Sequence, residues 1–472
     1  MSMRTDWIFE RMAQWPERQA MIRGARTTTY ADLLEMVAGW QRGFAARQIL
    51  PGQTVVVRAD FTPAACALLL ALIKHGATLV PLTMATAAQH EELFAAVAAD
   101  VVLTQLPNPS QSAAPPSSEA GADIDFLGDD ERWQVQCRAN QTPHPLVARL
   151  RESGTPGLIA FTSGSTGKPK AILHDLSKFM ETYREQRRSM CTITFLSFDH
   201  LGGINTLLYV LSSGGTMIPL SARDPETVCK AVAAHRVELL PTSPTFLKLL
   251  LISEAYRRYD LSSLKLLTYG TEVMPESTLQ QLQAVLPGVR LQQTYAFSEG
   301  PPLRLKSQAA GSLWIKIDGE GIEIKVIDGQ LWVRSPKAML GYLNAPNPFA
   351  ADGWLNTGDM VEVDGEYVRI LGRKSEIINV GGEKVFPAEI ENVILQVANI
   401  KDVTVKGKAN AIVGNIVTAT VTLDQPEDPA AVEQRVRSFC QSQLPAFKVP
   451  AIVRVAGQPL HNERFKKIRT AS

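Results

Sequence analysis

Residues 161–170 have the sequence FTSGSTGKPK, which combines two glycines, four hydroxyl side chains and two lysines. Glycine lets the backbone turn tightly, and backbone N–H groups, hydroxyls and ammonium groups can together surround phosphate oxygens. The stretch is not a Walker A loop, because Thr162 and Pro169 stand where that motif has a glycine and a hydroxyl residue. Apolar runs at 157–161 and 171–173 predict a strand on each side, whereas a flexible glycine-serine linker is rarely flanked in this way. The sequence therefore predicts a polyphosphate-binding loop that joins two strands.

The size and charge of the chain limit its architecture and its partners. The 472 residues are too many for one ordinary hydrophobic core, so we expect a large domain and a smaller one. The 48 basic and 47 acidic residues leave a net charge of +1, which argues against nucleic acid or an anionic membrane as the main partner. The longest apolar run, residues 64–73, is much shorter than the roughly 20 residues that a membrane-spanning helix needs. We therefore expect no membrane span. Five scattered cysteines favour neither a disulfide framework nor a metal site, so we expect a cytoplasmic protein.

Strand and helix patterns alternate in the N-terminal part. Strands are predicted at 27–30, 54–57 and 77–82, and amphipathic or buried helices at 31–47 and 63–74. This alternation predicts an α/β fold with mostly parallel sheets that are covered by helices on both faces.

Later segments change in character. Residues 107–123 are rich in Pro, Ser and Ala and predict a surface loop of weak order. The Asp328-Gly329 pair separates two alternating runs and predicts a β-hairpin in a small antiparallel β subdomain. Strands near 403–405 and 416–423, followed by a helix over 429–444, predict a small α+β domain at the C-terminus.

Four motifs in order give the chain a resemblance to a known family. They are TSGSTGKPK at 162–170, TYAFSE at 294–299, GWLNTGD at 353–359 and NVGGEKVFPAEIE at 379–391. Together they resemble the signatures of the adenylate-forming enzymes, which include acyl- and aryl-CoA ligases, stand-alone carrier-protein ligases, peptide-synthetase adenylation domains and luciferases.

The resemblance implies an ATP-dependent, AMP-forming acid-thiol ligase. Such an enzyme converts a small carboxylic acid to an acyl-AMP with release of pyrophosphate, and then forms a thioester with CoA or with the phosphopantetheine of a carrier protein. The resemblance also implies an adenylation core over residues 1–373 and a mobile C-terminal domain over 374–472. Ser375 stands at the hinge, where the family usually has Asp or Lys. The chain contains no carrier-protein domain of its own, so the thiol must come from CoA or a separate carrier.

The resemblance also assigns roles at the nucleotide. The phosphates of ATP would contact Thr162, Ser163, Gly164, Ser165, Thr166, Gly167 and Lys170. The base would lie beside Gly270 and Thr271 and stack on Tyr295, while Asp359 and Arg373 would hold the ribose. Glu299 would offer a hard oxygen ligand to Mg²⁺, and the Ser298 hydroxyl would lie near phosphate or carboxylate oxygens.

The catalytic lysine of the family falls in the last segment. Aligning Asn462 and Arg469 with the family pattern selects Lys466, with Phe465 in place of a glycine, and leaves Lys467 as the alternative. An ammonium group there would stabilise the charge shared by the carboxylate and the α-phosphate in the transition state. A basic tail without catalytic function is the competing interpretation.

Further roles follow for the two other substrates. His200, Gly203 and Phe297 are expected to wall the pocket for the acid, and Gly381 and Gly382 to line the entry tunnel of the thiol.

Two alternatives to this function stay open. Asp199 could pair with the ammonium group of an amino acid, which would make the chain an amino-acid adenylation enzyme, although a structural role for Asp199 is the preferred interpretation. The departures from the family pattern at Ala296, Ser375 and Phe465 also allow an inactive nucleotide-binding scaffold.

Overall fold

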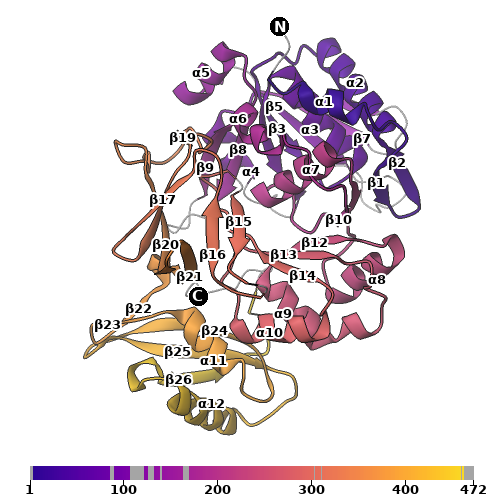
Figure 1. Ribbon diagram of the computed structural model, residues 1–472. Helices are drawn as coiled ribbons and strands as arrows, with labels where there is room; N and C mark the ends of the chain where they lie inside the picture. Colours follow the sequence, from indigo (N-terminus) through magenta and orange to yellow (C-terminus); the bar gives the residue numbers. More distant parts are fainter. Residues whose placement is uncertain are drawn as a thin grey trace.

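The computed structural model describes residues 4–84, 90–106, 122–125, 132–138, 141–162, 169–301, 303–309, 311–458 and 460–461. Within these residues the strands form four sheets, which we call sheets A to D. Sheets A and B belong to the N-terminal part, sheet C is the small β subdomain, and sheet D lies in the C-terminal part at one end of the molecule (Figure 1).

Sheet A is almost entirely parallel. It contains β1 (Gln19–Arg23), β2 (Arg26–Thr29), β10 (Cys191–Ile193), β11 (Thr216–Ile218), β12 (Leu239–Thr242), β13 (Leu266–Tyr269) and β14 (Arg290–Gln293). The strand order is β14-β13-β12-β10-β11-β1-β2, and of the neighbouring pairs that the structure describes, β1 and β2 run antiparallel while the others run parallel.

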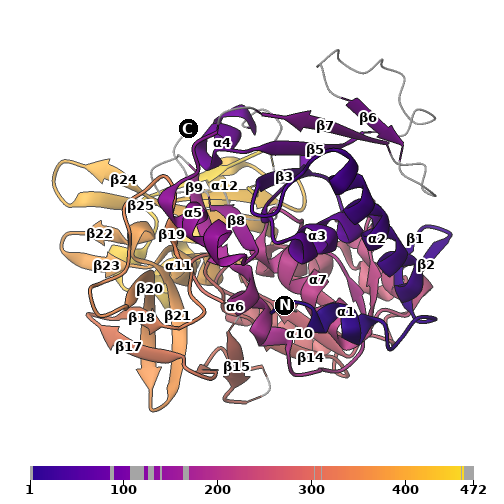
Figure 2. The same cartoon turned by 90° about the horizontal axis from the view of Figure 1, so that it is seen from above.

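Sheet B has a parallel centre and antiparallel edges. It contains β3 (Thr54–Arg58), β4 (Thr78–Leu82), β5 (Val101–Leu106), β6 (Ala122–Asp125), β7 (Arg132–Cys137), β8 (Gly157–Thr162), β9 (Lys170–Asp175) and β19 (Gly341–Tyr342). The order is β19-β9-β8-β4-β3-β5-β7-β6. Strands β8, β4, β3 and β5 are parallel, whereas β9 and β19 at one edge and β7 and β6 at the other are antiparallel. Strands β6 and β7 lie at the margin of the molecule in the view from above (Figure 2).

Helices fill the space between sheets A and B and cover their outer faces. Those of the N-terminal part are α1 (Trp7–Met12), α2 (Tyr30–Ala46), α3 (Pro63–His75), α4 (His90–Val97), α5 (Pro145–Ser153), α6 (Leu176–Met180), α7 (Leu201–Ser213), α8 (Pro225–His235), α9 (Pro244–Ser253) and α10 (Glu276–Val285), with short 3₁₀ turns η2 (Glu181–Tyr183) and η3 (Ala255–Arg257). One apolar cluster joins α1, α2, α3 and α7 to both sheets, a second joins α8, α9 and α10 to sheet A, and a third joins α4 and α5 to sheet B. The α/β expectation is confirmed.

Helix α3 illustrates how the sequence specifies this arrangement. The Thr62 side chain accepts a hydrogen bond from the Ala65 N–H, Pro63 occupies the first turn, and Gly76 ends the helix in the left-handed region at φ 76°. Every residue from 63 to 73 is buried, as expected for a helix that is apolar on all sides and lies between two sheets.

One expectation about the N-terminal part needs correction. The predicted loop at 107–123 ends in strand, because Ala122 and Asp123 belong to β6 and pair with Val135 and Gln134 of β7. Pairing along a sheet edge overrides the local composition there. Residues 107–121 lie outside the described residues.

Sheet C confirms the expected antiparallel subdomain. It contains β15 (Arg304–Ser307), β16 (Ile315–Asp318), β17 (Glu323–Ile327), β18 (Gln330–Arg334), β20 (Leu355–Asp364) and β21 (Tyr367–Arg373), in the order β15-β16-β21-β20-β18-β17. Asp328 and Gly329 connect β17 to β18 with φ angles of 51° and 73°, the combination that a two-residue hairpin turn of type I′ requires.

The C-terminal part has its own sheet and its own core. Sheet D contains β22 (Ile378–Val380), β23 (Glu383–Val385), β24 (Ile400–Asn410), β25 (Gly414–Leu423) and β26 (Ile452–Val455), and the helical segments are η4 (Lys374–Glu376), α11 (Pro387–Ile394), α12 (Pro429–Gln443) and η5 (Ala446–Lys448). One cluster of buried aliphatic residues joins α11 and α12 to this sheet. Strand β21 ends at Arg373, so the proposed division between 373 and 374 falls at a strand end, and its role as a hinge stays a prediction. None of the helices in the described residues is long and apolar enough to cross a membrane.

Candidate active site

A buried carboxylate at the centre of the site has two polar partners. The Tyr295 hydroxyl donates to Asp359 Oδ2 at 2.6 Å, and Arg373 Nε lies 2.8 Å from Asp359 Oδ1. Sheet C sets this geometry, because Asp359 of β20 and Arg373 of β21 are directly opposite each other in the antiparallel register. Burial raises the pKa of the Asp359 carboxyl, against the opposing effects of Arg373 and Tyr295. The structure thus brings together three residues that the sequence assigned to the base and the ribose.

The second part of the site lies at the carboxyl edge of sheet A. Strands β13 and β14 are parallel, so Gly270, which follows β13, and Thr294, which follows β14, meet at the same edge. A Cβ atom at Gly270 would lie 2.8 Å from the backbone oxygen of Thr294, so a side chain has no room there. Thr271 has φ 72°, a strained angle for a β-branched residue. Tyr295 comes directly after Thr294, and the residues expected beside the base therefore share this edge.

Tyr342 connects the predicted metal ligand to the end of residues 161–170, the predicted phosphate-binding stretch. Its hydroxyl donates to Glu299 Oε1 at 2.6 Å, and the Lys170 ammonium group lies 4.9 Å from the centre of its ring. Strand β19 places Tyr342 there, because it pairs with β9, the strand that begins at Lys170. Tyr342 lies outside the four motifs and had no predicted role.

The exit of the phosphate-binding stretch is held by a second residue without an assigned role. Asn344 donates from Nδ2 to the Pro169 carbonyl at 2.9 Å and accepts from the Ala171 N–H through Oδ1 at 2.8 Å. Thr162 and Lys170 form the first pair of the β8–β9 register, which confirms the two expected strands. The predicted phosphate contacts Ser163, Gly164, Ser165, Thr166 and Gly167 lie outside the described residues, as do Lys466 and Lys467.

A histidine outside the sequence motifs contacts the predicted catalytic turn. His174 of β9 is buried, and its Nε2 lies 2.8 Å from the Ser298 carbonyl oxygen. Since a carbonyl can only accept, Nε2 carries the proton. Burial lowers the pKa of His174 to about 4, so the ring is neutral near pH 7. A polar residue within the apolar run of a buried strand is the sequence signal that could have found it.

The described residues fit a magnesium ion held mainly by its substrate. No group of three or more His, Cys, Asp or Glu side chains in the described part of the chain could hold a metal by itself. Mg²⁺ usually binds through one or two carboxylates together with substrate phosphates and water. Glu299, close to the Lys170 end of the phosphate-binding stretch, matches that pattern.

The residues expected in the acid pocket have structural functions. His200 caps helix α7, since its Nδ1 accepts from the Gly202 N–H at 2.9 Å. A Cβ atom at Gly203 would overlap the Ser197 carbonyl oxygen. Asp199 accepts from the Ser197 hydroxyl at 2.6 Å and the Thr83 hydroxyl at 3.3 Å. These contacts support the structural interpretation of Asp199, and the pocket roles of His200 and Gly203 stay predictions.

The other predicted residues occupy a core and a turn. Phe297 is buried, packs in the apolar cluster of sheet C and lies 6.0 Å from the Tyr295 ring, so its role as a pocket wall also stays a prediction. Ser375 lies in η4. Gly381 and Gly382 form the exposed β22–β23 turn at φ 58° and 93°, where glycine is the residue that fits without strain.

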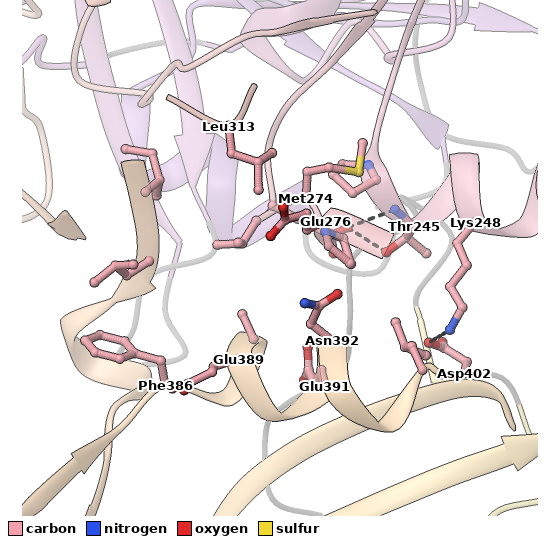
Figure 3. A pocket seen from close by; sticks show the side chains of 18 of the residues that line it. Thr245, Lys248, Met274, Glu276, Leu313, Phe386, Glu389, Glu391, Asn392 and Asp402 are labelled. Atoms are coloured by element: carbon pink, nitrogen blue, oxygen red, sulfur yellow. Dashed lines mark hydrogen bonds and ion pairs between the residues drawn. The ribbon is translucent and has the colours of Figure 1, made fainter. Parts of the chain in front are cut away.

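A cavity of 340 Å³ separates the N-terminal part from α11 and β24 of the C-terminal part (Figure 3). We call this boundary the seam. Lys248 of α9 forms an ion pair across it with Asp402 at 3.3 Å, and the Ser277 hydroxyl donates to Asn392 at 3.0 Å. Neither contact has a local sequence signal, because the partners are 154 and 115 residues apart.

Comparison with known proteins gives matches along most of the chain. A family model described as AMP-binding enzyme matches residues 8–343, and one described as AMP-binding enzyme C-terminal domain matches residues 389–466. An indoleacetate–CoA ligase from Aromatoleum aromaticum is 29% identical over 92% of this chain and 92% of its own. A medium/long-chain-fatty-acid–[acyl-carrier-protein] ligase from Mycobacterium tuberculosis is 26% identical over 96% and 92%. The crystal structure of the anthranilate CoA ligase AuaEII with anthranoyl-AMP superimposes with a TM-score of 0.77, over 98% of this chain and 95% of that one, at 17% identity.

Proposed function

The chain belongs to the AMP-binding enzyme family, and we propose that it activates a small carboxylic acid with ATP and passes the acyl group to a pantetheine thiol. The family model spans both the residues around the phosphate-binding stretch and the Tyr342 that contacts Glu299. The named relatives are ligases that join acids to CoA or to a carrier protein.

In the first half-reaction, a carboxylate oxygen attacks the α-phosphorus of ATP and the bond to pyrophosphate breaks. Asp359 and Arg373 would hold the ribose, and Tyr295 would lie against the base. Thr162 and Lys170, with the glycine and hydroxyl residues between them, would hold the leaving phosphates. Positioning and charge stabilisation, rather than covalent chemistry by the protein, would supply most of the rate enhancement.

Magnesium would be held by Glu299 and the substrate phosphates, and it would neutralise charge on the phosphate oxygens. Tyr342 supports this role, since its hydroxyl holds one oxygen of the Glu299 carboxylate at 2.6 Å. Lys466 would stabilise the charge between acid and α-phosphate.

In the second half-reaction, the thiol releases its proton to solvent and its sulfur attacks the acyl carbon, AMP leaves with the electrons of the anhydride bond, and a thioester forms. We propose that the C-terminal residues 374–472 turn about Ser375, which would withdraw Lys466 and present Gly381 and Gly382 to the thiol. The separate core of sheet D supports such a movement, as does a seam whose described contacts between Lys248 and Asp402 and between Ser277 and Asn392 involve side chains rather than paired strands.

The observation that carries this function is the contact of Asp359 with Tyr295 and Arg373. A buried carboxylate with a cationic and a phenolic partner, at the meeting point of sheets A and C, offers a vicinal diol two strong acceptors. The test is pyrophosphate release with a panel of acids that includes indoleacetate, fatty acids of medium and long chain, and amino acids.

The panel separates the candidate functions. Release with a carboxylic acid supports the ligase, release with an amino acid alone supports the amino-acid alternative, and ATP binding without release with any acid supports a scaffold. Lys466→Ala should abolish release, whereas loss in Lys467→Ala with full activity in Lys466→Ala would move the catalytic lysine by one residue.

The acceptor needs a separate assay. CoA is the acceptor named for the indoleacetate ligase, and a carrier protein is the one named for the mycobacterial relative. We propose CoA, and comparison of CoA with a phosphopantetheinylated carrier protein, at equal thiol concentration, decides between them.

A further inference from the structure

The Ser298–Glu299 turn is attached at three points to β9, the strand that begins at the end of the predicted phosphate-binding stretch, and to residues in and just before its neighbour β19. The Ser298 carbonyl accepts from His174 of β9, and the Glu299 carbonyl accepts from the Met339 N–H, each at 2.8 Å. The Glu299 carboxylate accepts from Tyr342 of β19 at 2.6 Å. Because β19 and β9 are paired, these contacts form one connected unit. The unit ties a predicted metal ligand to the predicted phosphate site.

The surroundings of His174 indicate why an imidazole is present. The ring is 1% exposed and packs edge-on against Phe179 at 5.7 Å. Its Nδ1 has no hydrogen-bond partner among the described residues, and a buried polar atom without a partner is destabilising. An aliphatic side chain would avoid that cost. The favourable interaction that remains is the Nε2–H donation to Ser298, so this hydrogen bond is the feature that distinguishes histidine from a core residue.

The strand geometry relates His174 to the phosphate site. Side chains alternate along a strand, so positions 170, 172 and 174 of β9 lie on one face. Lys170 is the first residue of β9, Ile172 pairs with Tyr342, and His174 reaches Ser298. A displacement of β9 would therefore be transmitted to Lys170 and to the Ser298–Glu299 turn together.

We propose that His174 is a positioning residue of the adenylation half-reaction, which fixes the Ser298–Glu299 turn relative to the strand leaving the phosphate site while Tyr342 orients the Glu299 carboxylate. The inference rests on the proposed function, and it deepens it by naming residues that act through Glu299 without touching the nucleotide.

The test compares His174→Leu with His174→Gln. Leucine removes the donor at similar volume, whereas the glutamine amide can replace Nε2–H. The first readout is binding of α,β-methylene-ATP by calorimetry, with and without Mg²⁺, which needs no acid and no turnover. We expect His174→Leu to reduce the gain in affinity that Mg²⁺ brings by about tenfold, the effect of losing one hydrogen bond, and His174→Gln to stay within about threefold of the wild type. The second readout is pyrophosphate release, where kcat should fall in the leucine variant while the KM of the acid stays unchanged.

A second histidine provides the control. His75 Nε2 lies 2.8 Å from the Ile49 carbonyl oxygen, a contact of the same kind in α3. His75→Leu should leave the magnesium effect unchanged. If His174→Leu does not fold, Tyr342→Phe serves in its place and should reduce the magnesium effect to a similar extent.

Three results would overturn the inference: an unchanged magnesium effect in His174→Leu, an equal loss in His174→Gln, or an equal loss in His75→Leu. Failure of the proposed function would look different, because the wild type would then release no pyrophosphate with any acid, while the binding experiment would still report on His174.

Discussion

The proposed nucleotide site and the seam are built in opposite ways. At the proposed nucleotide site, Asp359 and Arg373 are placed by strand register within one sheet, and paired backbone reinforces their side-chain contact. Across the seam, the ion pair of Lys248 with Asp402 and the Ser277 hydrogen bond stand beside a 340 Å³ cavity. Backbone pairing fixes distances, whereas side-chain contacts between two cores can be exchanged. The comparison supports the proposal that the nucleotide binds within the N-terminal part and that the C-terminal part can move relative to it.

The largest effect should come from Asp359→Asn. The change removes the charge that holds Arg373 and would accept from the ribose. We expect α,β-methylene-ATP to bind about 100-fold more weakly in calorimetry, since hydrogen bonds to charged groups contribute roughly 1.5–3 kcal/mol each. Asp364→Asn, at the exposed end of the same strand, is the matched control and should bind normally. If the two variants bind α,β-methylene-ATP with equal affinity, Asp359 does not contact the nucleotide.

Gly270→Ala should have the next largest effect. A Cβ atom there would meet the Thr294 backbone oxygen, so the edge of sheet A must shift, at a cost of about 2 kcal/mol in the free energy of unfolding measured in urea. Gly382→Ala is the control from the C-terminal part. It has nothing within 4 Å of the new atom and only the strain of a positive φ, about 1 kcal/mol, to overcome. A loss of unfolding free energy with Gly382→Ala that equals or exceeds the loss with Gly270→Ala would contradict this expectation.

The seam should show a smaller energy. A double-mutant cycle of Lys248→Ala and Asp402→Ala should give a coupling of about 1–2 kcal/mol, between the values typical of exposed and of buried pairs. The two side chains are 15% and 10% exposed. The exposed pair Lys306 and Asp318 is the control and should give less than about 1 kcal/mol. A coupling at the seam no larger than in the control would mean that the ion pair does not hold the two parts together.

The smallest expected difference between the two parts is in the reactivity of their buried cysteine thiols. Burial raises the pKa of Cys229 in α8 to about 12 and that of Cys440 in α12 to about 11, so neither should react with a thiol reagent in the folded protein, while exposed Cys137 should. If the two parts are separate cores, Cys440 and Cys229 should become reactive at different urea concentrations. The extent of labelling at each cysteine is measured by mass spectrometry of peptides. Simultaneous exposure would show one cooperative unit.

Local pattern was sufficient for the elements and for one part of the site. The alternation of strands and helices and the Asp328-Gly329 turn gave sheets that the structure confirms. Tyr295 and Asp359 were grouped through motifs, and the structure places them in contact. Motifs succeed here because each contains residues whose chemistry suits one ligand.

The remaining contacts depend on sheet order, which local sequence does not encode. His174 and Ser298 are 124 residues apart, and Tyr342 and Glu299 are 43 apart. The Tyr342 contact arises because β19, far along the chain, pairs with β9, and the His174 contact because β9 lies beside the turn that follows β14. For the same reason β6 escaped prediction, since its strand conformation comes from pairing with β7 rather than from its composition.

The two-residue strand β19 also determines how the protein can be divided for expression. It covers the outer edge of sheet B, where Leu340 N–H bonds to the Leu173 carbonyl and Leu343 N–H to the Ala171 carbonyl. A fragment that stops before residue 340 would leave the β9 edge open, and an open edge strand is a template for association with other chains. Truncations intended to isolate the N-terminal part should therefore extend past residue 343 if they are to stay monomeric.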